Sequence, residues 1–182
     1  MAIWQFNIEF FPLKGIEAEL GHLPNKLPSQ FLPDAIDINT DLDEYEDPRI
    51  KFWMNQSRAE FTELITKLTS ELPEVEWLKN STDVFSWGHE DTNDLTLSFT
   101  EGDKIESFGC RIDLREFDEE FIDLILELCT SREYLLTDRK GNIRTPERLE
   151  LGKLISNSNP ANFVADPEQF LRDFKLGKRK PE

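Results

Sequence analysis

The chain has 182 residues with 37 acidic and 21 basic side chains, and its formal net charge at pH 7 is −16. Hydrophobic residues make up 38% of the chain and include 14 Phe and 4 Trp, so we expect a folded core rather than global disorder. A strongly negative protein repels nucleic-acid phosphates and attracts basic proteins. We therefore expect no nucleic-acid partner.

Neither an export signal nor a membrane span is expected. The N-terminal residues lack a basic stretch followed by an apolar run, and nowhere do about 18 apolar residues stand in a row. We expect no membrane partner and a cytoplasmic location. Cys110 and Cys129 each lie among apolar neighbours and are expected to be free core thiols, because disulfide-stapled domains use cysteine far more densely.

The first half of the chain predicts one strand, one long loop and one helix. Residues 3–10 alternate in the manner of a half-buried strand. Residues 21–48 combine four prolines with a run of acids and predict a long acidic surface loop. Ser57 and Glu60 then fit a capping box, and the apolar stripe after them predicts a helix over 58–71.

The middle of the chain predicts a hairpin and a deeply packed helix. Residues 94–100 and 104–114 alternate and are joined by a turn that contains Gly102, which indicates a hairpin. Residues 117–129 are apolar over more than half of the helical circumference and acidic on the remainder. This pattern predicts a helix packed on a sheet with one acidic face outward. A short strand is expected at 134–136.

Helix start signals dominate the C-terminal part. Thr145, Asn159 and Asp166 each precede a proline, which is typical of helix N-termini, so we expect three short helices. No repeat or linker is evident, and residues 1–182 are predicted to form a single globular domain that ends in a short polar tail. Strands followed by helices predict an α+β fold, an antiparallel sheet with helices packed mainly on one face.

The common catalytic signatures are missing. The chain has no phosphate-binding glycine loop, no nucleophile elbow and no zinc-protease helix motif, and its only histidines are His22 and His89. We expect no catalytic residue, no cofactor and no metal. Leu42 and Pro48 stand where an EF-hand requires Gly and Glu, which excludes that motif. A loose cation site in the acidic loop remains open beside a simply solvated loop.

One predicted strand carries three charged residues at alternate positions, Arg111, Asp113 and Arg115. The strand period places them on the face opposite the core. Two interpretations stay open. The residues form an exposed ladder of ion pairs, or they form a polar site on an open sheet face that binds a ligand or partner.

Two acidic segments and one tryptophan form the predicted partner-binding surface. Their carboxylates suit a basic protein, and a Trp beside an acidic loop suits an interface hot spot. The residues are Asp37, Asp41, Asp43, Glu44, Glu46, Asp47, Glu119, Glu120, Asp123, Glu127 and Trp53. The alternative is that these acids only form a solvated face that keeps the protein soluble.

Residues 111–115, the apolar helix after them and residues 156–171 form a pattern of strand, helix and helix caps. Across residues 84–175 this pattern resembles small uncharacterised bacterial proteins, some of which are similar to immunity proteins encoded beside secreted toxins. The resemblance implies a non-enzymatic, cytoplasmic protein that inhibits a basic toxin by covering its active site. Two alternatives remain: an acidic structural or adaptor domain, and an enzyme that uses Asp113 with Arg111 and Arg115.

Overall fold

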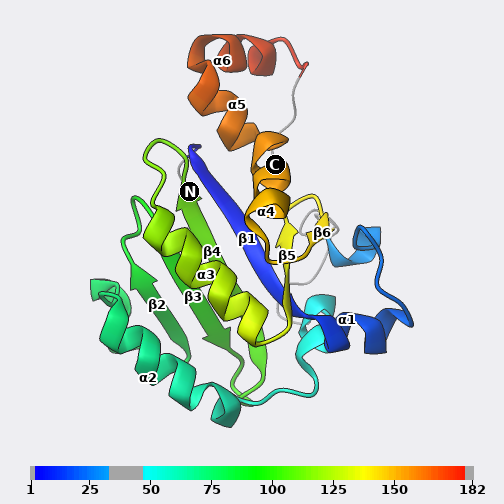
Figure 1. Ribbon diagram of the computed structural model, residues 1–182, viewed down its shortest axis with the longest axis vertical. Coiled ribbons are helices and arrows are strands. Elements are labelled where there is room, and N and C mark those ends of the chain that lie inside the picture. Colours follow the sequence, from blue (N-terminus) through cyan, green and yellow to red (C-terminus); the bar gives the residue numbers. More distant parts are fainter. Residues whose placement is uncertain (1–2, 33–46, 179–182) are drawn as a thin grey trace.

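The computed structural model describes residues 3–32 and 47–178 and has one six-stranded antiparallel sheet with the strand order β2-β3-β4-β1-β5-β6 (Figure 1). The strands are β1 Gln5–Pro12, β2 Val84–Gly88, β3 Asp94–Phe99, β4 Ile105–Asp113, β5 Tyr134–Asp138 and β6 Ile143–Arg144. The α-helices are α1 Leu13–Leu20, α2 Thr62–Glu71, α3 Glu119–Ser131, α4 Arg148–Ser156, α5 Asn159–Ala165 and α6 Pro167–Lys175. Short 3₁₀ helices are η1 Ser29–Phe31, η3 Pro48–Trp53, η4 Arg58–Phe61 and η5 Glu76–Leu78. The predicted α+β class is confirmed.

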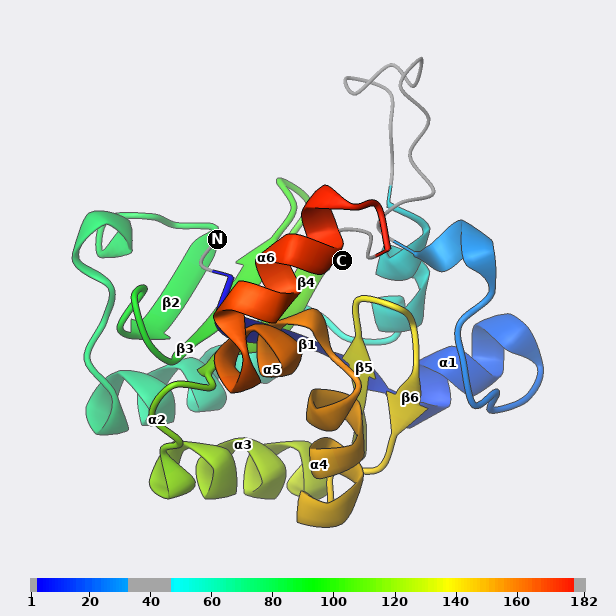
Figure 2. The same ribbon diagram turned by 90° about the horizontal axis from the view of Figure 1, so that it is seen from above.

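The helices are distributed unevenly about the sheet. Figure 2 shows α2 and α3 beneath one face, with α4 beside α3, whereas Figure 1 shows α5 and α6 beyond one end of the sheet. The prediction of helices mainly on one face is therefore confirmed. Within the two described ranges, no helix combines the length and apolar character needed to cross a membrane.

The core lies between the sheet and the α2–α3 layer. In β1, Phe6, Ile8 and Phe10 are buried and belong to the same apolar cluster as Ile122 and Ile125 of α3. The alternate apolar residues that the sequence analysis noted therefore form the buried face of the central strand. β1 begins and ends two residues later than the predicted strand at 3–10.

The two long helices differ in how closely they follow their sequence signals. α3 is capped by the Asp118 side chain, which accepts a hydrogen bond of 3.0 Å from the backbone N–H of Phe121. The predicted helix over 58–71 begins instead as the 3₁₀ helix η4 and continues as α2, and Ser57 makes no capping hydrogen bond. α4, α5 and α6 correspond to the three predicted C-terminal helices.

Backbone hydrogen bonds cover both outer strands of the sheet. Beside β2, Val75 N–H donates to the carbonyl of Ser86 over 2.9 Å. On β6, Ile143 N–H donates to the carbonyl of Asn25 over 3.0 Å. A strand edge with its backbone groups paired is a poor template for another chain. Partner binding by addition of a strand is therefore disfavoured at both edges.

Candidate functional site

The sheet presents polar side chains on the face opposite α2 and α3, here called the polar face. Cross-strand register places Arg111 between Asn7 of β1 and Asp94 of β3, and places Thr96 of β3 opposite Ser86 of β2. Since side chains alternate along each strand, these residues share one face. The polar face comprises Gln5, Asn7, Glu9, Ser86, Asp94, Thr96, Ser98, Ser107, Arg111 and Asp113.

Arg111 and Asp94 form an ion pair across β3 and β4. The Arg111 Nε atom lies 3.0 Å from Asp94 Oδ1, and the Asp94 side chain is only 2% exposed. Burial raises the pKa of Asp94, while the hydrogen bond and charge of Arg111 oppose that rise. The Asp94 carboxylate is therefore buried, and the Arg111 guanidinium compensates its negative charge.

Arg115 and Asp113 form a separate pair at the end of β4. Arg115 Nε and Nη2 lie 3.0 Å and 2.6 Å from the two Asp113 oxygens, and the guanidinium lies 4.1 Å from the ring centroid of Trp4. The hydrogen bond from Arg115 lowers the pKa of Asp113. An aspartate held ionised in this way is a poor general base near neutral pH.

The sequence grouping of Arg111, Asp113 and Arg115 is thus divided in the structure. Each arginine bonds a different aspartate, and both aspartates are buried rather than part of an exposed ladder. Of the three grouped residues, Arg111 alone lines the cavity described next. The partner of Arg111 lies 17 residues earlier in the chain, where strand pairing alone brings it close.

A cavity of about 360 Å³ opens on the polar face. Its wall includes Trp77 from η5, Glu90 from the β2–β3 turn, and the Arg111–Asp94 pair. We call it the Trp77 cavity. Val75, Leu78 and Val84 supply apolar wall, and Asn7, Glu9, Ser86, Thr96, Ser107 and Arg139 supply further polar lining.

Trp77 is the exposed tryptophan of the described chain, with 71% of its surface accessible. Its indole N–H donates to Glu90 Oε2 over 2.9 Å. Gln5 in turn holds the turn that carries Glu90, since its side-chain amide donates to the carbonyls of Glu90 and Thr92 at 2.9 Å and 2.7 Å. The buried side chain of Gln5 thereby ties the cavity wall to the central strand.

Trp53 is a correction to the predicted binding surface. It is 1% exposed and packs among four aromatic rings, those of Phe11, Phe61, Phe108 and Tyr134, at centroid distances of 5.4 to 6.4 Å. It is a core residue that no partner can reach in this structure. Sequence alone could not separate Trp53 from Trp77, because each stands within two residues of a charged side chain and beside apolar ones.

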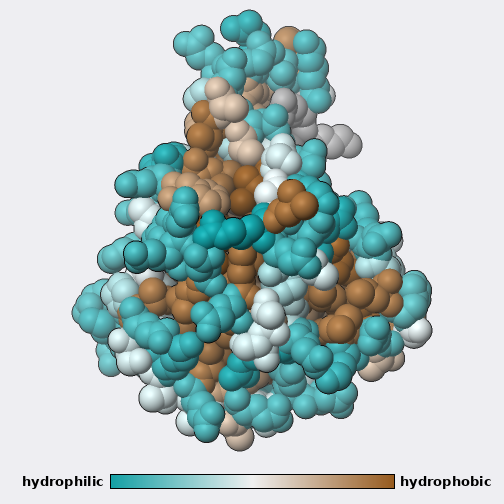
Figure 3. Space-filling model, in the orientation of Figure 1, coloured by the Kyte–Doolittle hydropathy of each residue, from teal (hydrophilic) through white to brown (hydrophobic). Residues whose placement is uncertain are grey.

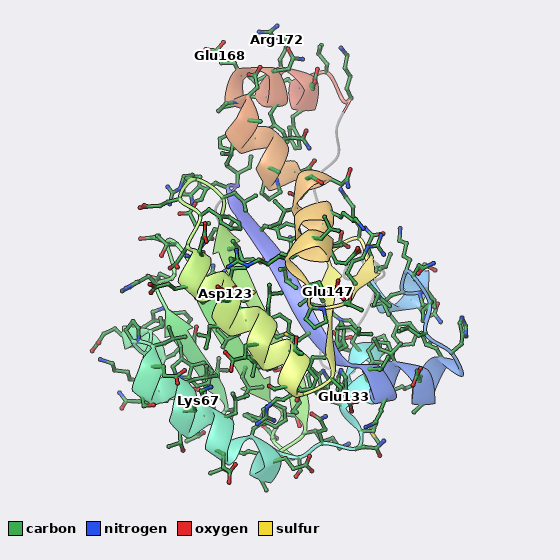
Figure 4. All side chains as sticks on the ribbon, viewed as in Figure 1. Lys67, Asp123, Glu133, Glu147, Glu168 and Arg172 are labelled. Carbon is green, nitrogen blue, oxygen red and sulfur yellow. The ribbon has the colours of Figure 1, made fainter. Side chains whose placement is uncertain are left out.

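The four predicted acids on α3 are all exposed. Glu119, Glu120, Asp123 and Glu127 lie on the side of the helix that faces away from the core, and Figure 4 shows Asp123 on that side. Arg148 of α4 lies 2.6 Å from Asp123 and 3.8 Å from Glu119. Among the described residues, Glu120 and Glu127 have no such cationic neighbour.

The remaining predicted acids belong to the loop before η3. Asp47 caps η3 by accepting a 2.8 Å hydrogen bond from the N–H of Arg49, and also pairs with the Arg49 side chain at 2.5 Å. Arg49 also bonds Glu9 on the polar face at 2.6 Å. Asp47 therefore has a structural role at the start of η3. Asp37, Asp41, Asp43, Glu44 and Glu46 lie outside the described residues.

The described part of the chain offers few side chains that could bind a metal ion or act as a nucleophile. No group of three or more His, Cys, Asp or Glu residues there is arranged to hold a metal ion. Cys110 and Cys129 are buried free thiols, and burial raises the pKa of each.

Comparisons with protein-family models, with curated proteins and with solved structures find no match to this chain.

Proposed function

We propose that this chain is a non-enzymatic binding protein of the immunity type, which inhibits a basic protein such as a secreted toxin by covering that protein's active site. The observation that carries the proposal is the outward row of carboxylates on α3, fixed to a helix whose other side lies in the core. Exposed carboxylates held on one side of the protein produce a negative field that attracts a basic protein and speeds its encounter.

The four carboxylates of this row differ in whether a cation pairs with them. Arg148 pairs with Asp123 and lies near Glu119, whereas Glu120 and Glu127 form no ion pair with another described residue. Figure 3 shows hydrophilic residues interspersed with apolar ones over α2 and α3, a mixture found on protein surfaces in general. Glu120 and Glu127 are therefore the acids expected to contribute most to encounter with a basic partner.

The enzyme alternative receives less support. Both carboxylate oxygens of Asp113 are bonded by Arg115 and the pKa of Asp113 is lowered, so this carboxylate is a weak base near neutral pH. Arg111 in turn is bonded to Asp94.

The test begins with an affinity pull-down of the tagged protein from its native lysate, at about 50 mM and then about 200 mM salt, to identify a basic partner. Association rates are then measured for the wild type and for Glu120→Gln/Glu127→Gln. A matched control, Glu101→Gln/Glu168→Gln, removes the same charge from the β3–β4 turn and from α6 (Figure 4 labels Glu168).

The α3 variant should associate several-fold more slowly than the wild type, and the difference should shrink at the higher salt because screening weakens long-range attraction. The control should slow association less. Absence of any specific basic partner would contradict the proposal and favour an acidic adaptor domain. Equal effects of the two variants would remove the role assigned to α3.

A further inference from the structure

Trp77 presents a large apolar surface to solvent in a held orientation. A Trp side chain is highly buried in most proteins, and an accessible Trp is enriched at the centres of protein interfaces. The hydrogen bond from its indole N–H to Glu90 restricts rotation of the ring. The ring is thus organised before any partner arrives, which lowers the entropic cost of binding.

Glu90 places a negative charge at the same wall of the cavity. Its Oε2 accepts the indole hydrogen bond, and its Oε1 makes no hydrogen bond to another described residue. The turn that carries it is tied to β1 through Gln5. A fixed aromatic face beside a carboxylate is the arrangement that binds an alkylammonium or guanidinium cation.

Glu90 is the carboxylate of the cavity wall that is left to attract a cation. The charged residues of the wall are Glu9, Glu90, Asp94, Arg111 and Arg139. Asp94 bonds Arg111 and Glu9 bonds Arg49, whereas Glu90 forms no ion pair with another described residue. An anionic ligand beside Trp77 would meet the Glu90 carboxylate unfavourably.

The cavity has room for one long side chain, and its lining suits one. Its volume of about 360 Å³ lies at the small end of the roughly 300–1,000 Å³ of ligand pockets. Val75, Leu78 and Val84 offer apolar contact to a methylene stem, while the charged group meets Trp77 and Glu90.

We propose that the Trp77 cavity receives the side chain of an arginine or lysine from the basic partner. The inference rests on the proposed function and locates the anchor of the interface on the polar face. Since α3 lies on the other side of the sheet (Figure 2), its carboxylates then act on the partner's approach, while the Trp77 cavity determines how long the complex lasts.

The first experiment needs no partner protein. N-acetyl-L-arginine amide is titrated into the ¹⁵N-labelled chain, and the indole N–H signal of Trp77 is followed by NMR, identified by its loss in Trp77→Phe. N-acetyl-L-citrulline amide, the neutral isostere, is the control probe. The Trp77 signal should shift in a saturable manner with the arginine probe and much less with the citrulline probe.

Two substitutions sharpen the result. Glu90→Gln keeps an acceptor for the indole N–H but removes the charge, and should weaken binding of the arginine probe about fivefold, the size expected for one exposed cation contact. Glu120→Gln removes the same charge from α3 and should leave the titration unchanged. A titration without saturation, an equal response to the citrulline probe, or equal weakening by both substitutions would overturn the inference.

The identified partner supplies the second readout. Trp77→Ala should raise its dissociation rate at least tenfold, as expected for loss of a hot-spot residue, with a smaller change in association rate. If Trp77→Ala leaves dissociation unchanged while the partner still binds, the inference fails and the proposed function stands. If no basic partner exists but the arginine probe binds, the cavity stands only as a guanidinium-binding site, and both its role in an interface and the proposed function fail.

Discussion

Arg111 Nε lies 3.0 Å from Oδ1 of Asp94, and this bond compensates a carboxylate that is almost completely buried between strands of the sheet. We predict that Arg111→Leu lowers the free energy of unfolding at pH 7 by about 3 kcal/mol, because it leaves a buried charge without a partner. Urea unfolding monitored by circular dichroism measures this loss.

Two controls separate loss of charge compensation from loss of packing. The double variant Asp94→Asn/Arg111→Leu should be more stable than Arg111→Leu, since no buried charge is left unpaired. Burial raises the pKa of Asp94, and a raised pKa gives stability that is complete below about 3.8 and lost as the pH rises through the folded-state value. The cost of Arg111→Leu should therefore be smaller at pH 4 than at pH 7, and an unchanged cost would contradict this account.

Asp113 should have the opposite pH dependence. Its pKa is lowered, first by the side-chain hydrogen bond from Arg115, so its stabilising contribution is present above the ordinary value of 3.8 and lost as the pH falls through the folded-state value. The stability difference between wild type and Asp113→Asn should therefore shrink between pH 6 and pH 2. Urea unfolding at several pH values measures it, and a difference that grows on acidification would refute the assignment.

Trp53 and Trp77 should respond differently to truncation. Trp53→Ala opens a cavity among four aromatic rings and should lower the free energy of unfolding by about 3–5 kcal/mol. Trp77→Ala removes an exposed ring and should change it by no more than about 0.5 kcal/mol. Similar losses for both variants in chemical unfolding would contradict the burial assigned to each.

Two helical glycines form a second matched pair. A Cβ on Gly15 of α1 would lie 1.8 Å from the carbonyl oxygen of Phe52, so Gly15→Ala should cost about 3 kcal/mol or more. Gly152 of α4 has no atom within 4 Å of an added Cβ, so Gly152→Ala should stabilise the protein by about 1 kcal/mol through helix propensity. Thermal unfolding should move in opposite directions for the two variants.

The two cysteines should be unreactive while the protein is folded. Burial raises the pKa of both Cys110 and Cys129, which removes the reactive thiolate, and neither sulfur is accessible to a reagent. A chromogenic thiol reagent should detect almost no thiol in native buffer and both thiols in concentrated guanidinium chloride. Failure to detect thiols after unfolding would indicate a disulfide instead.

Part of the site was predictable and part was not. The acidic face of α3 follows from helical periodicity, because apolar residues covering more than half of the circumference leave one face for Glu120, Asp123 and Glu127. The Trp77 cavity has no comparable signal, since its walls come from η5, a turn and several strands. β2 and β6 also escaped prediction, because the adjacent apolar residues Val84 and Phe85 break the alternation of β2 and because β6 has only two residues.

The sequence by itself determined the local structure: the alternation of β1, the buried stripe of α3, and the cap at Asp166, whose side chain accepts a 2.9 Å hydrogen bond from Gln169 N–H. These features depend on residues a few positions apart. Tertiary structure alone decided which tryptophan is exposed and which aspartate Arg111 bonds. Those outcomes depend on strand order and packing between distant segments, which no local pattern of residues specifies.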